Sequence, residues 1–111
     1  MLLLIMWLSL VYTQVASAAD DPVLVGAGDI AQCPLPGAAA TATLLDQITG
    51  TVFTAGDNVY PDGTAEEFET CYGPTWGRHK ASTYPSPGNH EYHTAEARPY
   101  YAYFGDRAGM L

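Results

Sequence analysis

The sequence predicts an α/β fold in which parallel strands alternate with helices. Three segments share one layout, an extended apolar stretch that ends in Gly followed by Asp or Asn, and helical patterns separate them. The segments are Val23–Asp29, Thr51–Asp57 and Thr83–Asn89. Strand, helix, strand, helix, strand at this spacing is typical of parallel βαβ units. We therefore expect one sheet whose strands end at the same edge.

Each expected element has local support in the sequence. The first two strand segments are short, rich in β-branched residues and bounded by turn residues, as in buried strands. Two prolines in Thr83–Asn89 indicate a short, irregular third strand. A helix is expected over Ala38–Ile48, with an apolar face of Leu44, Leu45 and Ile48. A capping box over Thr64–Glu67 predicts a second short helix that ends near Tyr72.

Length and charge exclude several classes of protein. The chain has 111 residues, 4 Lys plus Arg against 12 Asp plus Glu, and a formal net charge of −8. Nucleic-acid binding by charge is excluded, because phosphate backbones are bound by basic surfaces. Hydrophobic residues make up 48%, which excludes a disordered chain. The length fits one small domain or part of a larger one.

The N-terminus carries the features of a signal peptide. The first 19 residues contain no charged side chain, Leu2–Val11 is apolar except for Ser9, and Ala16–Ala18 gives a small-x-small pattern. We predict a signal peptide over residues 1–18 and a mature segment over 19–111. Cleavage leaves a secreted product, extracellular or periplasmic, without a stable membrane span. The alternatives are an uncleaved membrane anchor, although the apolar stretch is shorter than a bilayer requires, and a mis-started reading frame.

The two cysteines are interpreted in the light of export. In an oxidising compartment Cys33 and Cys71 are expected to form a disulfide, and the alternative is a pair of free thiols. In the loop-entropy model, closing a loop of this size contributes about 3–4 kcal/mol to stability. Metal binding by this pair is not expected, because no C-x-x-C spacing is present.

The polar residues at the strand ends predict a metal site. Asp29, Asp57 and Asn89 each follow a strand segment and should converge at one edge of the sheet. Two carboxylates brought together repel each other unless a cation is present. The repeated placement at strand ends therefore points to bound metal.

Two longer motifs resemble those of a known family. Gly56–Tyr60 reads G-D-N-V-Y and Gly88–Glu91 reads G-N-H-E. They resemble the G-D-x-x-Y and G-N-H-E motifs of the calcineurin-like metallophosphoesterases, most closely the purple acid phosphatase branch. Asp29 stands where the family has its first aspartate, but Ala31 replaces the family's usual His or Gly. The resemblance implies the front half of the family's β-sandwich flanked by helices.

The resemblance also implies a binuclear metal centre. Two metal ions, Fe, Zn, Mn or Mg, would be bridged by Asp57, with Asp29 on the first and Asn89 on the second. Tyr60 corresponds to the family's phenolate ligand, although a tyrosine after a turn is often only packing. His90 would face the phosphate and would stabilise its oxyanion or protonate the departing alkoxide.

Neighbouring residues and the missing part of the domain complete the expectation. Glu91 is expected to orient its neighbours through hydrogen bonds, and His93 either joins the pocket wall or lies on an exposed loop. The family's later motifs, a lone His and G-H-x-H, do not occur in the chain. We therefore expect a fragment that lacks the C-terminal half of the domain, or a truncated product, with weak metal binding and little activity alone.

The predicted function is that of a secreted metal-dependent hydrolase of phosphoric esters, acting on a small phosphate-ester substrate. The alternative from another class is a catalytically inactive, disulfide-stabilised secreted module for binding or structure.

Overall fold

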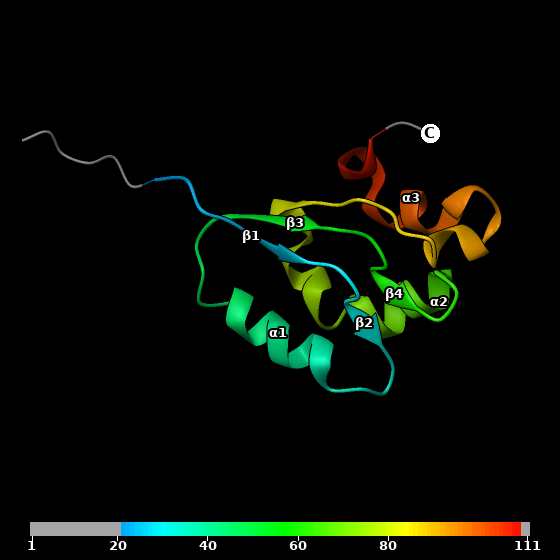
Figure 1. Ribbon diagram of the computed structural model, residues 1–111, viewed down its shortest axis with the longest axis horizontal. Helices are drawn as coiled ribbons and strands as arrows, with labels where there is room; N and C mark the ends of the chain where they lie inside the picture. The colour runs from blue at the N-terminus through cyan, green and yellow to red at the C-terminus, as the bar shows by residue number, and fades with distance from the viewer. Residues whose placement is uncertain (1–20, 110–111) are drawn as a thin grey trace, which may run out of the picture.

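A three-stranded parallel sheet lies at the centre of the structure (Figure 1). The computed structural model describes residues 21–109, so the predicted signal peptide over residues 1–18 lies outside the described residues. The strands stand in the order β1-β3-β5, with bounds β1 (Leu24–Ala27), β3 (Thr51–Thr54) and β5 (Thr83–Tyr84). A second parallel pair, which the sequence did not predict, consists of β2 (Ala31–Gln32) and β4 (Val59–Tyr60).

Helical segments connect the strands in the expected alternation. The α-helices are α1 (Gly37–Leu45), α2 (Ala65–Glu67) and α3 (Arg98–Phe104). A π-helical turn, η1 (Phe68–Tyr72), continues α2, and the 3-10 segments are η2 (Trp76–Ser82), η3 (Glu91–His93), η4 (Ala95–Ala97) and η5 (Gly105–Ala108). In Figure 1, α1 lies along one side of the central sheet and α3 lies near α2. Within residues 21–109, no helix has the length and apolar character that a membrane span requires.

The register of the sheet puts one row of side chains into the core. Val25 pairs with Val52, and Val52 pairs in turn with Thr83. Val52 and Thr83 are buried, and Val52 belongs to the main apolar cluster. The third strand is only two residues long, as its prolines indicated. The α/β class and the short parallel strands are therefore present in the structure.

The first helix differs from the prediction in its end and in its buried face. It ends at Leu45, three residues before the predicted Ile48, and its buried residues are Ala38, Ala42 and Leu45. Leu44 and Ile48 are 61% and 41% exposed, so the predicted apolar face was wrong in these two members. The small alanines allow α1 to lie close to η2, where Trp76 Nε1 donates to Thr41 Oγ1 at 2.8 Å. The buried face of α1 is therefore the one whose small side chains let the helix lie close to η2, and not the one with the largest apolar side chains.

The second helix begins as predicted. Thr64 Oγ1 accepts a hydrogen bond from Glu67 N at 3.2 Å, and Glu67 Oε2 accepts one from Thr64 N at 2.8 Å. This reciprocal pair confirms the capping box. The helical path continues through η1 and ends at Tyr72, where the sequence placed it.

A disulfide joins Cys33 to Cys71, with 5.5 Å between the Cα atoms. It is the pairing that the sequence favoured over two free thiols. The bond ties the loop after β2 to η1, so the segment that follows Asp29 is anchored to the helical layer.

An aromatic cluster fills the core between η1 and α3. Phe68, Tyr72, Tyr100 and Phe104 are buried and pack mostly edge to face. Among the described residues, the hydroxyls of Tyr72 and Tyr100 are buried without a hydrogen-bond partner. Burial is the largest cause that raises the pKa of Tyr72 above the ordinary tyrosine value, and Tyr103 adds to it. Both hydroxyls therefore carry a desolvation cost with no compensating bond.

We predict that Tyr72→Phe leaves the free energy of unfolding at pH 7 unchanged or raises it by about 1 kcal/mol, because it removes an unpartnered buried hydroxyl. The raised pKa of Tyr72 also means that stability falls once pH rises above about 10, where the unfolded phenol ionises and the folded one does not. The variant should show a smaller fall. Urea unfolding at pH 7 and above pH 10 measures both effects.

The control is Tyr84→Phe at pH 7, because Tyr84 is 60% exposed. A loss of more than about 1 kcal/mol in Tyr72→Phe at pH 7 would show that its hydroxyl has a partner, against the account given above.

Candidate metal centre

The turns that follow β1 and β3 run side by side through the two aspartates. Asp29 N donates to Gly56 O at 3.3 Å, and Ile30 N donates to Asp57 O at 3.0 Å. These bonds continue the pairing of β1 with β3 into that of β2 with β4. The backbone therefore holds Asp29 and Asp57 next to each other, beyond the carboxyl ends of both strands.

The turn after β5 closes on the same place. A Cβ atom built on Gly88 would lie 2.1 Å from Asp57 Oδ1 and 2.3 Å from Asp57 N, so only glycine fits. His90 N donates to Asp57 Oδ1 at 3.0 Å. Asn89 is exposed and lies between these two contacts. All three strand ends therefore meet at the Asp57 carboxylate, as parallel strands that end at one edge should.

Both aspartates adopt strained backbone conformations. Their φ angles are 52° at Asp29 and 50° at Asp57, in the left-handed region that residues with a side chain rarely occupy. Such positions cost about 1–3 kcal/mol each and concentrate at functional sites. The strain turns both carboxylates out of the strand direction at the same edge, which motivates a functional interpretation of the pair.

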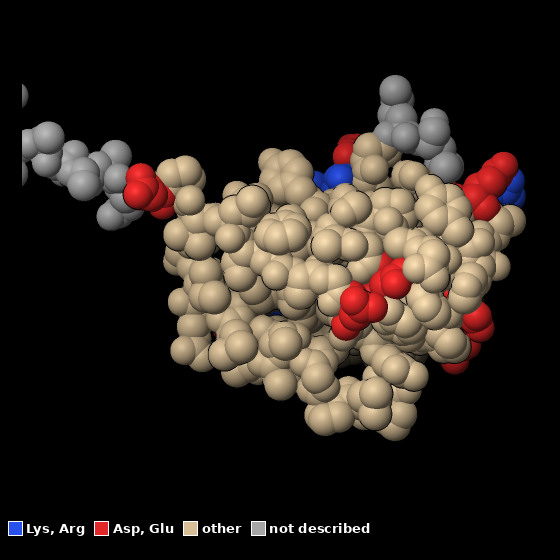
Figure 2. Space-filling view, in the orientation of Figure 1, with Lys and Arg blue, Asp and Glu red and all other residues tan. Residues whose placement is uncertain are grey.

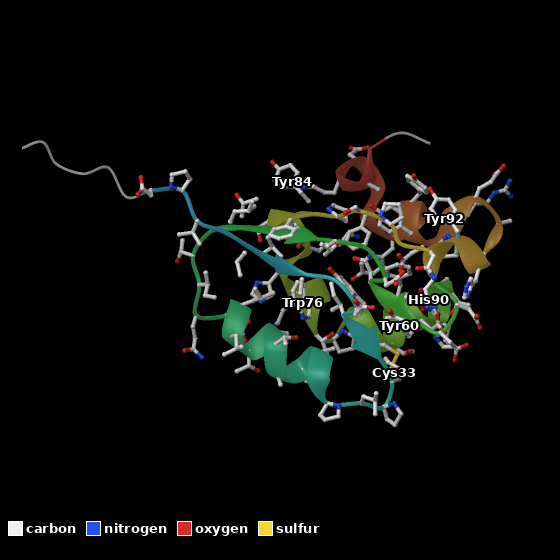
Figure 3. All side chains as sticks on the ribbon, in the orientation of Figure 1. Cys33, Tyr60, Trp76, Tyr84, His90 and Tyr92 are labelled. Carbon is white, nitrogen blue, oxygen red and sulfur yellow. A yellow bond between two sulfur atoms is a disulfide. The ribbon has the colours of Figure 1, made fainter. Side chains whose placement is uncertain are left out.

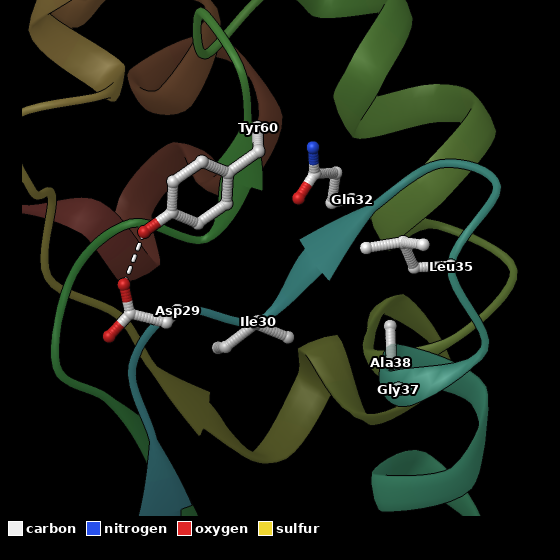
Figure 4. A pocket seen from close by; sticks show the side chains of 7 residues that line it. All are labelled: Asp29, Ile30, Gln32, Leu35, Gly37, Ala38 and Tyr60. Carbon is white, nitrogen blue, oxygen red and sulfur yellow. Dashed lines mark hydrogen bonds between the residues drawn. The ribbon is translucent and has the colours of Figure 1, made fainter.

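Tyr60 links the two carboxylates. Its hydroxyl donates to Asp29 Oδ1 (Figure 4) and lies 3.1 Å from Asp57 Oδ2. The hydrogen bond to Asp29 is the largest cause that raises the pKa of Tyr60 above the ordinary tyrosine value, followed by burial and by Asp57. Three oxygen-bearing side chains therefore share one position, with a phenolic proton between the two carboxylates.

The carbonyl oxygen of Pro61 orients the His90 imidazole. Its Nδ1 lies 2.6 Å from Pro61 O, and its ring centroid lies 4.2 Å from that of Tyr60; Figure 3 shows the two side chains together. A carbonyl oxygen only accepts, so Nδ1 carries the proton and donates it. This fixes the tautomer and leaves Nε2 as the nitrogen that can exchange a proton with a ligand.

His93 lies next to His90 and Pro61, but its ring forms no hydrogen bond with Asp29, Asp57 or Tyr60 among the described residues. Its Nδ1 lies 3.2 Å from both Pro61 O and Asp62 Oδ1, and its ring lies 4.8 Å from that of His90. The side chain is 47% exposed. The contacts of Pro61 and Asp62 with the two histidines were not predicted, although Pro61-Asp62-Gly63 is a recognisable turn sequence.

Glu91 is the internal support of this edge. It is fully buried, its Oε1 accepts from Asn58 N at 2.8 Å and Val59 N at 3.2 Å, and its Oε2 accepts from Gly88 N at 2.6 Å. One carboxylate thus satisfies three backbone donors that belong to the turns after β3 and β5. The two turns are held together by charge-assisted hydrogen bonds in a dry environment.

No Lys or Arg of the described residues forms an ion pair with Asp29 or Asp57. The four Lys and Arg residues contact other groups, through the pairs Arg78–Asp46, Arg98–Glu96, Lys80–Tyr103 and Arg107–Tyr84. Figure 2 shows a mostly uncharged face with acidic side chains near its centre. No Lys or Arg among the described residues is therefore paired with Asp29 or Asp57, and two adjacent carboxylates without such a partner are the kind of group that a cation can stabilise.

The side chains at the strand ends offer oxygen atoms as potential metal ligands. Asp29, Asp57, Tyr60 and Asn89 offer oxygen ligands, which suit hard cations such as Mg²⁺, Mn²⁺ or Fe³⁺. Within residues 21–109, no three His, Cys, Asp or Glu side chains gather in an arrangement that could hold a metal. Two carboxylates, a phenol and an amide are the oxygen donors that the sequence places at this edge, and a cation bound there stays a prediction.

Comparison with known proteins adds no relative. No protein-family model, curated protein or solved structure matches the chain. Metal binding and phosphoesterase activity therefore stay predictions, which depend on the two motifs and on the side chains at the strand ends.

Replacing Glu91 by Gln is predicted to lower the free energy of unfolding by about 2–4 kcal/mol. The amide of Gln still accepts from Asn58 and Val59, but its NH₂ group opposes the donor Gly88 N. Urea unfolding measures the loss, and hydrogen exchange should show faster exchange at these three amides. The control is Glu66→Gln on the exposed side of α2, for which a change within about 0.5 kcal/mol is expected. Equal stabilities of the two variants would contradict the role given to Glu91.

Replacing Gly88 by Ala is predicted to lower the free energy of unfolding by about 1–3 kcal/mol, since the new methyl group overlaps Asp57 backbone and side chain. The matched control is Gly37→Ala, because a Cβ atom there meets nothing within 4 Å. It should change stability by no more than about 1 kcal/mol, and in the favourable direction. Thermal and urea unfolding compare the pair. A tolerated Gly88→Ala would mean that the turn after β5 does not lie against Asp57.

Proposed function

We propose that the chain carries metal-binding residues of a secreted hydrolase of phosphoric esters. The observation that supports this most directly is the Tyr60 hydroxyl hydrogen-bonded to both Asp29 and Asp57 at the common end of two parallel strands. The G-N-H-E turn closes on the same carboxylate. Two adjacent carboxylates with no Lys or Arg beside them would be stabilised by cations, and the same cations would offset the negative charge of a phosphate ester.

The residues that would hold the metal are Asp29, Asp57, Tyr60 and Asn89. When bound, the ions supply positive charge that polarises the phosphoryl group and offsets the charge of the ester. Tyr60 would bind the metal as a phenolate. It would therefore have to release the hydroxyl proton that it now donates to Asp29. Cation binding should therefore release a proton, and affinity should rise with pH.

His90 is positioned to move the proton of the reaction. Hydrolysis attaches the oxygen of water to phosphorus, breaks the P–O bond to the alcohol and leaves an alkoxide that must take up a proton. Pro61 O holds the Nδ1 side of the imidazole, so a protonated Nε2 is the group that can give this proton. General acid catalysis of this kind contributes about 10²–10⁴-fold.

Export is part of the same proposal. The Cys33–Cys71 disulfide is consistent with a secreted protein, since such bonds persist in oxidising compartments. The predicted signal peptide points the same way.

The first test is direct cation binding. We expect Mn²⁺ and Zn²⁺ to bind the full chain weakly, more tightly at pH 8 than at pH 6, with Asp57→Asn weakening the affinity by about tenfold or more. Isothermal titration calorimetry at both pH values measures this. Asp106→Asn is the matched control, because Asp106 is an exposed carboxylate outside the site. Equal affinities of the two variants would contradict the proposed metal site.

Hydrolysis of p-nitrophenyl phosphate with added Mn²⁺, Zn²⁺ or iron is the functional readout. Any turnover should disappear in Asp57→Ala. If neither cation binding nor turnover is found, the disulfide-stabilised, non-catalytic module becomes the better interpretation.

A further inference from the structure

A groove opens beside the Asp29–Tyr60 pair. It encloses about 270 Å³ and is shown in Figure 4. The two oxygen-bearing side chains lie at one end, and Leu35 and Ala38 line the other. Ile30 lies between the ends. The groove therefore shares Asp29 and Tyr60 with the candidate metal centre and leads from them toward the start of α1.

The groove changes from charged to apolar along its length. Beyond Asp29, no lining residue carries a formal charge, and Tyr60 and Gln32 are the uncharged polar members. The remaining side chains, Ile30, Leu35 and Ala38, are aliphatic. A ligand that spans the groove would therefore meet anionic oxygens at one end and hydrocarbon at the other.

Leu35 is held in place although it is exposed. It is 59% exposed, and it stands between Pro34 and Pro36, which restrict the backbone on both sides. Leu35 N donates to Gln32 O at 2.8 Å, and the neighbouring Cys33 is fixed by its disulfide. An apolar side chain presented on a restrained turn loses little entropy when it contacts a ligand.

We propose that this groove binds the alcohol portion of an apolar phosphate ester and that Leu35 is the main specificity-determining contact. The proposal rests on the proposed function, because the phosphoryl group would occupy the Asp29–Tyr60 end with its cations. The ester substituent then lies within reach of the aliphatic wall. The substrate class is thus phosphate esters of aryl or short alkyl alcohols.

The same lining disfavours the other common phosphate esters. A sugar alcohol would lose hydration in the apolar part and find only Gln32 as a polar partner. A nucleotide with further phosphates would need cationic side chains, and no Lys or Arg lines the groove. Selection therefore follows from desolvation and charge, not from shape alone.

The test uses non-hydrolysable probes and a binding readout. The full chain, labelled with ¹⁵N and supplied with Mg²⁺ or Zn²⁺, is titrated with phenylphosphonate and with methylphosphonate. Phenylphosphonate is expected to bind about tenfold more tightly, since its ring removes apolar surface from water. It should shift the amide signals of Ile30 and Ala38, which line the groove.

Leu35→Ala should weaken phenylphosphonate binding by about fivefold and leave methylphosphonate unchanged. Leu44→Ala is the matched control, because Leu44 is 61% exposed on α1 and does not line the groove. Leu35→Met, which keeps an apolar side chain of similar size, should retain the preference for the aryl probe.

Two failures are distinguishable. Equal affinities for the two phosphonates, or equal effects of Leu35→Ala and Leu44→Ala, would overturn the groove proposal and leave the metal site standing. If neither phosphonate binds in a cation-dependent way, the proposed function fails, and the groove proposal fails with it.

Discussion

The candidate site depends on the hydrogen bonds that the Glu91 carboxylate accepts from three backbone amides. This carboxylate is buried, and it satisfies the amides of Asn58, Val59 and Gly88, which come from two turns far apart in the sequence. Without it, the buried amides of Asn58 and Val59 and the part-buried amide of Gly88 would lack this partner, at a cost of about 1–3 kcal/mol for each buried donor. With it, Gly88 lies against Asp57, and the loop that carries Asn89 and His90 is brought to the ends of the first two strands.

At this edge of the sheet, the carboxylates of Asp29 and Asp57 have no Lys or Arg partner among the described residues. Asp29 and Asp57 lie side by side in strained backbone conformations, and both accept a hydrogen bond from the Tyr60 hydroxyl. Preorganised oxygens with unmet negative charge are what a hard cation needs. The apolar groove beside Tyr60 would set the orientation of a ligand, because a ligand held by the cations would extend along the groove.

Local signals in the sequence predicted part of this arrangement. The parallel order, the capping box at Thr64 and the Cys33–Cys71 pair follow from spacing, composition and compartment, and the structure contains them. The meeting of Asp29 with Asp57 follows from topology alone, since parallel strands end at one edge.

Other parts depend on tertiary contacts with no local signature. Leu44 was expected on a buried face but is exposed, because alanines bring α1 close to η2. The carbonyl of Pro61 orients His90, yet a backbone oxygen leaves no mark in a sequence. The groove at Leu35 exists only because the turn after β2 folds beside the Tyr60 ring.

The central claim is that this edge of the sheet is a cation site. Crystals of the chain grown with Mn²⁺ and measured for anomalous scattering test it most directly. We expect an anomalous peak at about 2.0–2.6 Å from carboxylate oxygens of both Asp29 and Asp57, with Tyr60 and Asn89 turned toward it. A map with no peak between the two aspartates, or with Mn²⁺ only at other carboxylates, would contradict the account.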